Sequence, residues 1–453
     1  MGRGAEMERF VNAFLQSILD LPLDAKTKGI PLAEGSIRLG DVGKRGWNVL
    51  RGDMMFPLLT LREAAMLDNL RLMRGFAERN GAVLAPHGKT MMCPQIYQDI
   101  LGEGGAWGLT AATVQQAAVV AASGARRIVI ANEVVGRANI EQLAELKRLH
   151  PAVRFYSLVD SPETAAMLER HGLPRLGAGG CFHVLLEVGH MGGRTGARTV
   201  ERAMAVVDAV RKSRGALQLS GVECFEGTIA KASVDETVAA IDSFLDFAVE
   251  VFTRARAAGA FEGCDEVLLS AGGSAYFDRV AARFGRARGA ENERVVLRGG
   301  CYVTFDHGAY LQKLKEIDAR GGLEGASGHI RASTAFKGAL ELWAMVESRP
   351  EPGLAIMTMG VRDLPHDSGF PVPLRQYRDG ALSASLFERE PRFRILRSND
   401  QHCYLEVPDG ADVRVGDVFA FGVSHPCTAF DKLDVLYRVD DDYNVTGALK
   451  TFF

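Results

Sequence analysis

Lys89 is the residue of this chain whose type and position best suit covalent chemistry. It lies in the segment APHGKT (Ala85 to Thr90), which follows the apolar run Ala82 to Ala85, a run with the composition of a buried strand. An amine at a strand's exit can form a Schiff base with an aldehyde cofactor and, once released, can move a proton on a substrate's alpha carbon. Because an isolated lysine is usually a solvated surface charge, the other motifs decide between the two interpretations.

A second candidate site is the segment Ser-His-Pro-Cys near the C-terminus. His425 and Cys427 stand two residues apart, so on an extended stretch both side chains point to the same side. This is the spacing of two metal ligands, and imidazole with thiolate suits Zn²⁺ better than Mg²⁺ or Mn²⁺. Two protein ligands leave open positions for water and substrate. A lone pair of this kind is also common among buried, inert cysteines.

Glycine-rich turns offer a place for a phosphate group. Gly272 and Gly273 present unobstructed backbone amides just before an expected helix start at Ser274. Barrel enzymes often bind phosphate in the loops after strands seven and eight, which here contain Gly273-Ser274 and Gly300, with Tyr302 close by. Alone this turn is weak evidence, and it gains weight from its pairing with Lys89.

Several separated motifs carry a resemblance to a known family. Lys89 with His87 and Thr90, followed far downstream by Ser424 to Cys427, resembles the D-serine dehydratase and D-threonine aldolase family, over about residues 45–435. The resemblance implies the alanine-racemase-type fold (fold type III) and pyridoxal phosphate (PLP) as the cofactor. It also implies a divalent metal at the downstream motif.

The resemblance assigns roles to further residues. Lys89 would be the PLP lysine with His87 beside it, and Arg194 in GHMGGRTG matches the arginine that contacts the cofactor's phenolic oxygen. His87 could instead be a core histidine bonded to backbone, and Arg194 could form an ion pair at the rim. Arg298 could face the ring nitrogen or brace the barrel, and both alternatives stay open.

The metal position and two weaker matches bear on the reaction and the substrate. Members of the dehydratase-like branch carry His plus Cys, as His425 and Cys427 do here, whereas the aldolase-like branch has Asp in the second position. Asp367 matches a substrate-side loop, although it could belong to an ordinary Asp-rich turn. His402 matches a family stretch in which an acidic residue usually precedes the histidine, and Gln401 departs from that pattern.

Eight short apolar runs separated by helix-like stretches predict the fold that positions these residues. Parallel βα units of this number predict a (β/α)₈ TIM-like barrel, and polar or glycine residues follow each run, at the rim where barrel enzymes build their sites. The expected strands are Ala82–Ala85, Ala106–Leu109, Arg127–Ala131, Arg154–Val159, His183–Val188, Leu217–Cys224, Glu266–Ser270 and Arg294–Leu297.

After about residue 335 the pattern changes to alternating segments separated by Pro, Gly and Asp clusters, which is typical of an antiparallel β domain. These segments are Leu354–Met359, Cys403–Val407, Val418–Phe421 and Val435–Val439. We therefore expect three parts. Residues 1–45 form a helical extension that packs with the C-terminal domain, residues 46–335 form the PLP-binding barrel, and residues 336–453 form the β domain that carries the metal site.

The composition excludes several other classes of protein. With 453 residues, 47% hydrophobic and 24% charged, the chain has an ordinary globular composition. A net charge of −3 gives no basic footprint, so neither nucleic acid nor an anionic membrane is an expected partner. Seven dispersed cysteines, an N-terminus without a signal-peptide pattern and the absence of a long apolar run favour the cytoplasm.

These observations predict a PLP- and metal-dependent dehydratase that converts a D-β-hydroxy amino acid, such as D-serine or D-threonine, to a 2-oxo acid and ammonia. The alternative within enzymes is a retro-aldol cleavage to glycine and an aldehyde. A racemase would need a second base and gives the metal no role. From another class, the chain could be a PLP-binding protein without turnover. The family favours a homodimer.

Overall fold

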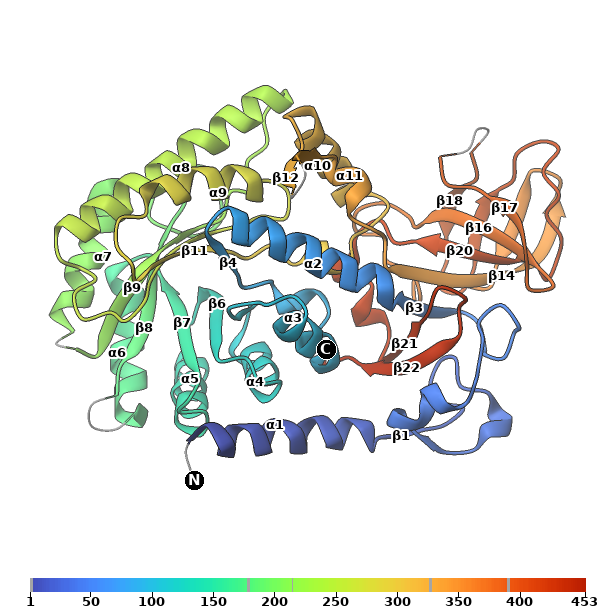
Figure 1. The fold of residues 1–453 in the computed structure, drawn as a ribbon, viewed down its shortest axis with the longest axis horizontal. Helices are drawn as coiled ribbons and strands as arrows, with labels where there is room; N and C mark the ends of the chain where they lie inside the picture. Colours follow the sequence, from blue (N-terminus) through green and yellow to red (C-terminus); the bar gives the residue numbers. More distant parts are fainter. Residues whose placement is uncertain (1–2, 177–179, 214, 326–327, 389–391) are drawn as a thin grey trace.

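The molecule consists of two lobes, a barrel surrounded by helices and a lobe of antiparallel strands (Figure 1). The structure, a computed structural model, describes residues 3–176, 180–213, 215–325, 328–388 and 392–453. Residues 1 and 2 of the expected N-terminal extension lie outside the described residues. Within those ranges, no helix combines the length and apolar composition that crossing a membrane requires.

Eight parallel strands form the barrel in the order β4-β11-β10-β9-β8-β7-β6-β5. The two end strands approach each other just beyond β4, where the amide of Thr110 donates to the Pro86 carbonyl over 3.0 Å. The predicted fold class, a nearly closed TIM-like barrel with a C-terminal antiparallel β domain, is thus confirmed. The strands are β4 (Ala82–Leu84), β5 (Leu109–Ala111), β6 (Arg127–Glu133), β7 (Arg154–Val159), β8 (Phe182–Val188), β9 (Leu217–Cys224), β10 (Val267–Ala271) and β11 (Glu293–Leu297).

The barrel strands are apolar on both faces because helices cover the outside and side chains fill the inside. All five residues of β10 are buried, and Tyr156, Leu185, Leu268 and Val296 belong to one cluster inside the barrel. The interior is therefore a packed core rather than a pore, and a ligand can bind only at an end.

Amphipathic helices close the outside of the barrel. In α5, Ile140, Leu143 and Ala144 are buried at helical spacing. Thr113 and Thr199 cap α4 and α7, and each cap of this kind contributes about 1 kcal/mol. The barrel helices are α2 (Glu63–Arg79), α3 (Pro94–Gly102), α4 (Val114–Ala122), α5 (Arg137–Leu149), α6 (Pro162–Leu176), α7 (Val200–Lys212), α8 (Val234–Ala257), α9 (Phe277–Ala287) and α10 (Ala309–Ala319), followed by the short α11 (Ala332–Ala335).

The second lobe is a 10-stranded, mainly antiparallel sheet. One of its strands, β3 (Leu58–Arg62), comes from the range that we expected in the barrel, because it pairs with β14 and β21 rather than with a barrel strand. The other strands are β14 (Leu340–Glu351), β15 (Leu354–Met357), β16 (Val372–Arg378), β17 (Ala381–Ser385), β18 (Arg394–Ser398), β19 (Cys403–Glu406), β20 (Val418–Gly422), β21 (Val435–Val439) and β22 (Val445–Lys450).

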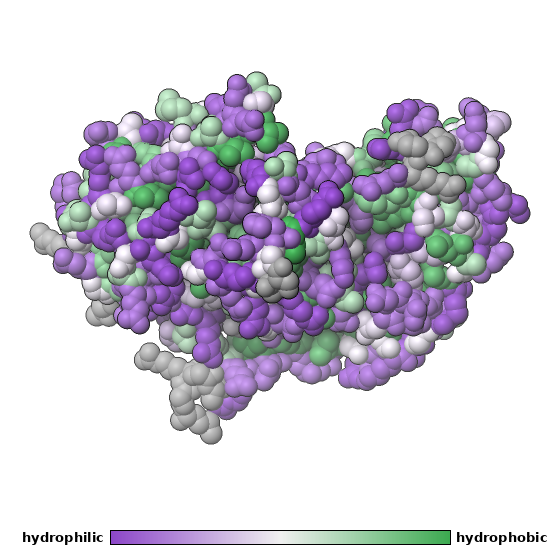
Figure 2. Space-filling view, turned by 45° about the horizontal axis from the view of Figure 1, so that its top comes forward, coloured by the Kyte–Doolittle hydropathy of each residue, from purple (hydrophilic) through white to green (hydrophobic). Residues whose placement is uncertain are grey.

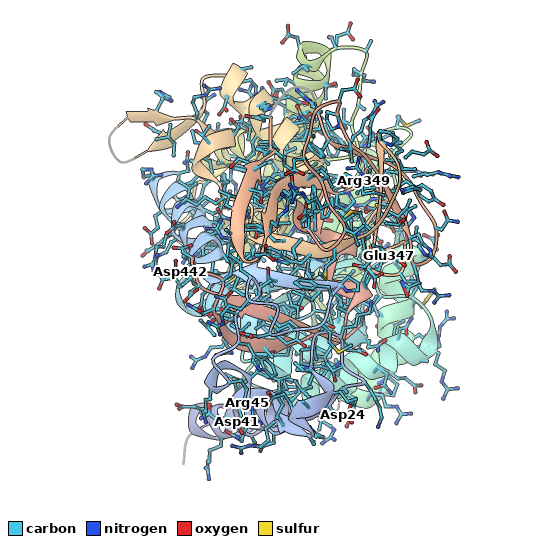
Figure 3. All side chains as sticks on the ribbon, turned by 90° about the vertical axis from the view of Figure 1, so that its right-hand side faces the viewer. Asp24, Asp41, Arg45, Glu347, Arg349 and Asp442 are labelled. Carbon is cyan, nitrogen blue, oxygen red and sulfur yellow. The ribbon has the colours of Figure 1, made fainter. Side chains whose placement is uncertain are left out.

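The N-terminal segment lies along the lower side of both lobes. Helix α1 (Arg3–Leu19) runs beneath the barrel, and the following residues, with the small hairpin of β1 (Pro22–Leu23) and β2 (Ile37–Arg38), lie below the second sheet (Figures 1 and 3). Ile30 and Val42 of this segment share a buried cluster with Trp343 of β14. A second small hairpin is formed by β12 (Leu323–Gly325) and β13 (Gly328–Ile330). The surface is largely hydrophilic, with a notch between the lobes (Figure 2).

Candidate active site

Three short 3₁₀ helices bring the predicted chemistry to the junction of the lobes. Residues Gly88–Thr90 follow β4 and carry Lys89, whereas Cys301–Val303 follow β11. Residues Pro426–Thr428 come from the second lobe and carry Cys427. The hydroxyl of Thr90 lies 3.2 Å from Cys427 Sγ. The turn that carries Lys89 therefore contacts the His425-Pro426-Cys427 (HPC) turn directly.

The Lys89 side chain is exposed at the barrel mouth, next to His87. The Lys89 amide donates to His87 Nδ1 over 3.4 Å. Burial lowers the pKa of His87 well below its ordinary value, and the positive charges of Lys89 and Arg298 lower it further. His87 is therefore neutral near pH 7.

Two facing glycine loops lie at the ends of β10 and β11. Gly272 adopts φ +137° and a Cβ there would meet the Arg298 amide at 2.7 Å, so the close approach requires glycine. The amides of Gly272 and Gly273 already donate to the buried carboxylate of Glu226, over 3.2 and 2.6 Å. Part of the expected phosphate cradle is thus occupied by an acidic side chain.

The remaining amides of these loops are available. The amides of Ser274 and the buried Gly300 have no acceptor within the described ranges. The Tyr302 ring, by contrast, packs into the core beside Phe336, and its buried hydroxyl finds no partner among those residues. Tyr302 therefore makes no hydrogen bond to the glycine loops in the described part of the chain, and its predicted contact with the cofactor stays a prediction.

The two arginines considered from the sequence differ sharply. Arg194 is exposed, and its guanidinium lies 4.4 Å from the centre of the Phe225 ring. Arg298 is buried and forms an ion pair with Glu223, with further hydrogen bonds to Ser270 Oγ at 2.9 Å and to the carbonyl of the residue after Glu223. These contacts join β9, β10 and the end of β11. Of the two roles considered for Arg298, they favour bracing the barrel.

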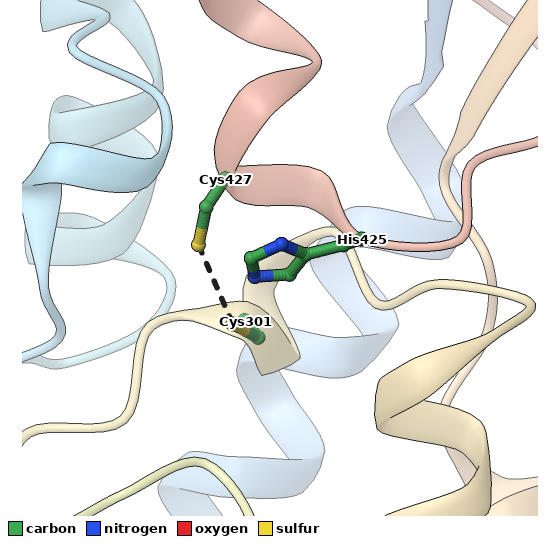
Figure 4. A group of neighbouring side chains, drawn as sticks. All are labelled: Cys301, His425 and Cys427. Carbon is green, nitrogen blue, oxygen red and sulfur yellow. Dashed lines mark hydrogen bonds between the residues drawn. The ribbon is translucent and has the colours of Figure 1, made fainter. Parts of the chain in front are cut away.

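His425, Cys427 and Cys301 form a group that could hold a metal (Figure 4). One ligand atom of each lies within 4.8 Å of the others, and the two sulfurs are 3.7 Å apart. Sequence reasoning missed Cys301, whose signal was its position directly after the Gly299-Gly300 pair that follows β11.

Hydrogen bonds within this group shift the pKa values of its members in different directions. The hydrogen bond from Cys301 is the largest of the effects that lower the pKa of Cys427, and the same bond raises the pKa of Cys301 well above its usual range. The hydrogen bond to Cys427 raises the pKa of His425 to about 9, and the nearby carboxylate of Asp367 adds to this shift. Cys427 is thus the thiolate of the group.

The two residues predicted on the substrate side are placed differently. Asp367 accepts a hydrogen bond from His425 Nδ1 at 2.6 Å and a second one from the Thr428 hydroxyl. Asp367 therefore contacts one of the three candidate metal ligands. His402 is exposed and lies 3.9 Å from Glu347, on the part of β14 that extends away from the barrel (Figures 1 and 3). No contact joins His402 to Lys89 or Cys427 in the described part of the chain.

A cavity of about 720 Å³ lies on the same rim, at the C-terminal ends of β5 to β7. It is lined by Asn132, Glu133, Asp160 and Thr195, among others. Behind it, burial raises the pKa of Glu187 to about 9, and the nearby carboxylate of Glu133 adds to the effect. Glu187 is therefore a neutral acid near pH 7.

An eight-stranded barrel with a lysine after its first strand and an antiparallel second domain defines a protein of the alanine-racemase type. The family model described as "Alanine racemase, N-terminal domain" matches residues 61–288, half of the chain, and the model described as "Putative serine dehydratase domain" matches residues 339–439. The chain belongs to the alanine racemase N-terminal domain family, the fold type III family of PLP enzymes.

Curated and solved relatives agree with this assignment. The D-threonine aldolase of Arthrobacter sp is 27% identical over 387 residues, which cover 85% of this chain and 89% of that protein. The crystal structure of D-threonine aldolase from Filomicrobium marinum has a TM-score of 0.70 and 26% identity, covering 90% and 97%. D-threo-3-hydroxyaspartate dehydratase from Delftia sp. HT23 has a TM-score of 0.67 at 20% identity, covering 89% and 99%, a likeness of fold.

Proposed function

We propose that this protein is a PLP- and zinc-dependent lyase that dehydrates a small D-β-hydroxy amino acid, such as D-serine or D-threonine, to a 2-oxo acid and ammonia. The observation that carries the proposal is the 3.2 Å contact between Thr90 Oγ1 and Cys427 Sγ. It joins the turn of the cofactor lysine to the ligands of the metal, so one substrate can reach both. The named relatives act on D-hydroxy amino acids, which supports the same substrate class.

The residues at the barrel mouth fit the cofactor. Lys89 offers an exposed amine, and the amides of Ser274 and Gly300 offer donors for phosphate oxygens. Arg194, stacked on Phe225, presents a cation at the same rim for the phenolic oxygen. When bound, PLP would supply an electron sink for the charge that develops at the substrate's alpha carbon.

The side chains around this site would handle the protons. The Lys89 amine, released by substrate, would take the proton from the alpha carbon. The neutral His87 beside it adds no positive charge that would oppose protonation of that amine. Asp367 holds Nδ1 of His425, which leaves Nε2 for a metal. When bound, the metal would act as a Lewis acid toward the leaving hydroxyl group.

Retro-aldol cleavage is the second candidate, and the aldolase relatives at 27% and 26% identity favour it. In that reaction the base takes the proton of the β-hydroxyl group, the bond between the alpha and beta carbons breaks, and glycine and an aldehyde leave. The thiol of Cys427, where the aldolase-like branch has a carboxylate, supports dehydration instead.

Product analysis separates these reactions. Purified protein with PLP and Zn²⁺ would be incubated with D-serine, D-threonine and D-threo-3-hydroxyaspartate separately, and each mixture assayed for 2-oxo acid, ammonia, glycine and aldehyde. We expect a 2-oxo acid with an equal amount of ammonia. Glycine with aldehyde would refute the proposed dehydration in favour of aldol cleavage. PLP binding without any product would support a non-catalytic binding protein.

Two further properties are part of the proposal. All seven cysteines are free, which supports a reducing compartment, and we propose the cytoplasm. We also propose a homodimer, without nucleic acid or membrane partners, as the resemblance implies. Light scattering coupled to size-exclusion chromatography would give a mass of about twice 49.0 kDa for the dimer.

A further inference from the structure

Cys301 adds a second thiol to the predicted His425 and Cys427 pair, from a different lobe of the molecule. Its 3₁₀ helix follows barrel strand β11, whereas the other two residues lie on the loop after β20. The three ligand atoms converge within 4.8 Å, with the imidazole and both thiols turned toward one another (Figure 4). We propose that Cys301 is a third protein ligand of the metal, so that the site is Cys₂His.

The sulfur separation matches a shared tetrahedral ion. Two thiolates at about 2.3 Å from a tetrahedral zinc lie roughly 3.8 Å apart, by the geometry of the tetrahedron. The sulfurs of Cys301 and Cys427 are 3.7 Å apart. A disulfide would need a separation of about 2.05 Å, so the present arrangement suits a bridging cation without a large movement of either turn.

The surroundings hold the group in the orientation that a metal needs. Asp367 binds His425 Nδ1 at 2.6 Å, which fixes the ring and turns Nε2 to the thiols. A carboxylate on the outer nitrogen of a metal-binding histidine is the usual supporting contact. Thr90 lies 3.2 Å from Cys427 Sγ, a contact that can persist as a hydrogen bond to the bound thiolate.

A third ligand changes what the metal can do, and this step rests on the proposed function. Three protein ligands leave one tetrahedral position, the arrangement of catalytic zinc sites, whereas two would leave two positions. The substrate would then bind through a single oxygen in that position. Two thiolates with an imidazole also select zinc over magnesium and manganese, which prefer oxygen ligands.

Counting the sulfurs around the bound metal tests the inference. X-ray absorption spectra would be recorded from the zinc-loaded full-length protein, from Cys301→Ser and from the control Cys264→Ser. Cys264 is also a partly buried thiol, but it precedes β10, at the end of the barrel remote from the site, and donates to the Leu219 carbonyl at 3.1 Å. Zinc affinity would be measured for each by competition with a chromophoric chelator.

We expect two sulfur neighbours per zinc in the wild type and in Cys264→Ser, and one in Cys301→Ser. The Cys301→Ser change should weaken zinc binding roughly 100-fold or more, beyond the range of about 10–100-fold that loss of a supporting contact causes. One sulfur in the wild type, or equal affinity in Cys301→Ser and Cys264→Ser, would overturn the inference. The wild-type spectrum decides the matter even if a variant folds poorly.

The outcomes also separate this inference from the proposed function. Two sulfurs around zinc without turnover of any D-hydroxy amino acid would uphold the Cys₂His site and refute the lyase. Metal-dependent turnover with one sulfur neighbour would uphold the lyase and return the site to His425 and Cys427 alone.

Discussion

The buried acid Glu187 gives a quantitative prediction. Its pKa is raised to about 9, chiefly by burial, from an ordinary value of 4.5. Thr195 donates to Oε1 at 2.9 Å, while Oε2 and the facing Glu133 Oε1 are buried without a partner in the described ranges. A proton on Oε2 fits this environment, and the amide of glutamine would imitate the protonated acid.

Glu187→Gln should therefore stabilise the protein, increasingly so as the pH rises. Below pH 4.5 the carboxyl is protonated in both the folded and the unfolded chain, so it does not penalise folding. Between pH 4.5 and about 9 only the unfolded chain releases the proton, so the stability of the wild type falls progressively over this range. One pH unit corresponds to about 1.4 kcal/mol, and 2.5 units separate 4.5 from pH 7. The variant should gain about 3 kcal/mol over the wild type at pH 7, relative to their difference at pH 4.5.

Urea denaturation of both proteins at several pH values between 4.5 and 8.5 would measure this gain. Glu266→Gln is the matched control. Burial acts to raise the pKa of Glu266, but the hydrogen bonds from Arg127 and Trp107 together with the charges of Arg127 and Arg154 lower it overall. Removing that carboxylate should destabilise the protein above pH 4.5, the opposite sign. A gain for Glu187→Gln that does not change with pH would refute the assignment of the proton.

Three further predictions concern the candidate site. Lys89→Arg keeps the charge but should abolish turnover and the pyridoxyl peptide that borohydride reduction of the PLP-loaded wild type yields, as mass spectrometry would show. Asp367→Asn should weaken metal binding roughly 10–100-fold by loosening its hold on His425, the proposed metal ligand, measured by chelator competition, and an unchanged affinity would contradict that role. Gly300→Ala should weaken PLP binding in an absorbance titration, because its Cβ would meet the His87 carbonyl at 2.6 Å. Gly285→Ala, whose Cβ would have a nearest neighbour at 3.9 Å, is the control and should bind normally.

Much of the barrel could be predicted because its signal is local. Most of the strands are short, largely buried apolar runs, and Thr113 and Thr199 mark helix starts by their type alone. The second strand was expected at residues 106–109 but forms at Leu109–Ala111. Strand β3 could not be assigned to the second sheet, because its apolar run resembles a barrel strand and its partner β14 follows some 280 residues later.

The site was only partly predictable for the same reason. Lys89 and the HPC motif stand out by residue type and spacing, whereas Cys301 and Cys427 are 126 residues apart and meet only when the two lobes pack together. The contact of Asp367 with His425 likewise depends on tertiary structure. Arg298 shows most clearly what the sequence cannot decide. Whether it faces the cofactor ring or braces the barrel depends on which acceptors lie near it, and only the structure shows that these are Ser270 and Glu223.

The central claim is that an amine-bound cofactor and a metal act on one substrate at the junction of the lobes. Its most direct test follows turnover of D-threonine and D-serine by the PLP- and zinc-loaded protein before and after chelation, while the absorbance of the lysine-bound cofactor is recorded. We predict that chelation abolishes turnover but preserves the absorbance, and that zinc restores activity. Turnover that persists in the metal-free protein would contradict the account.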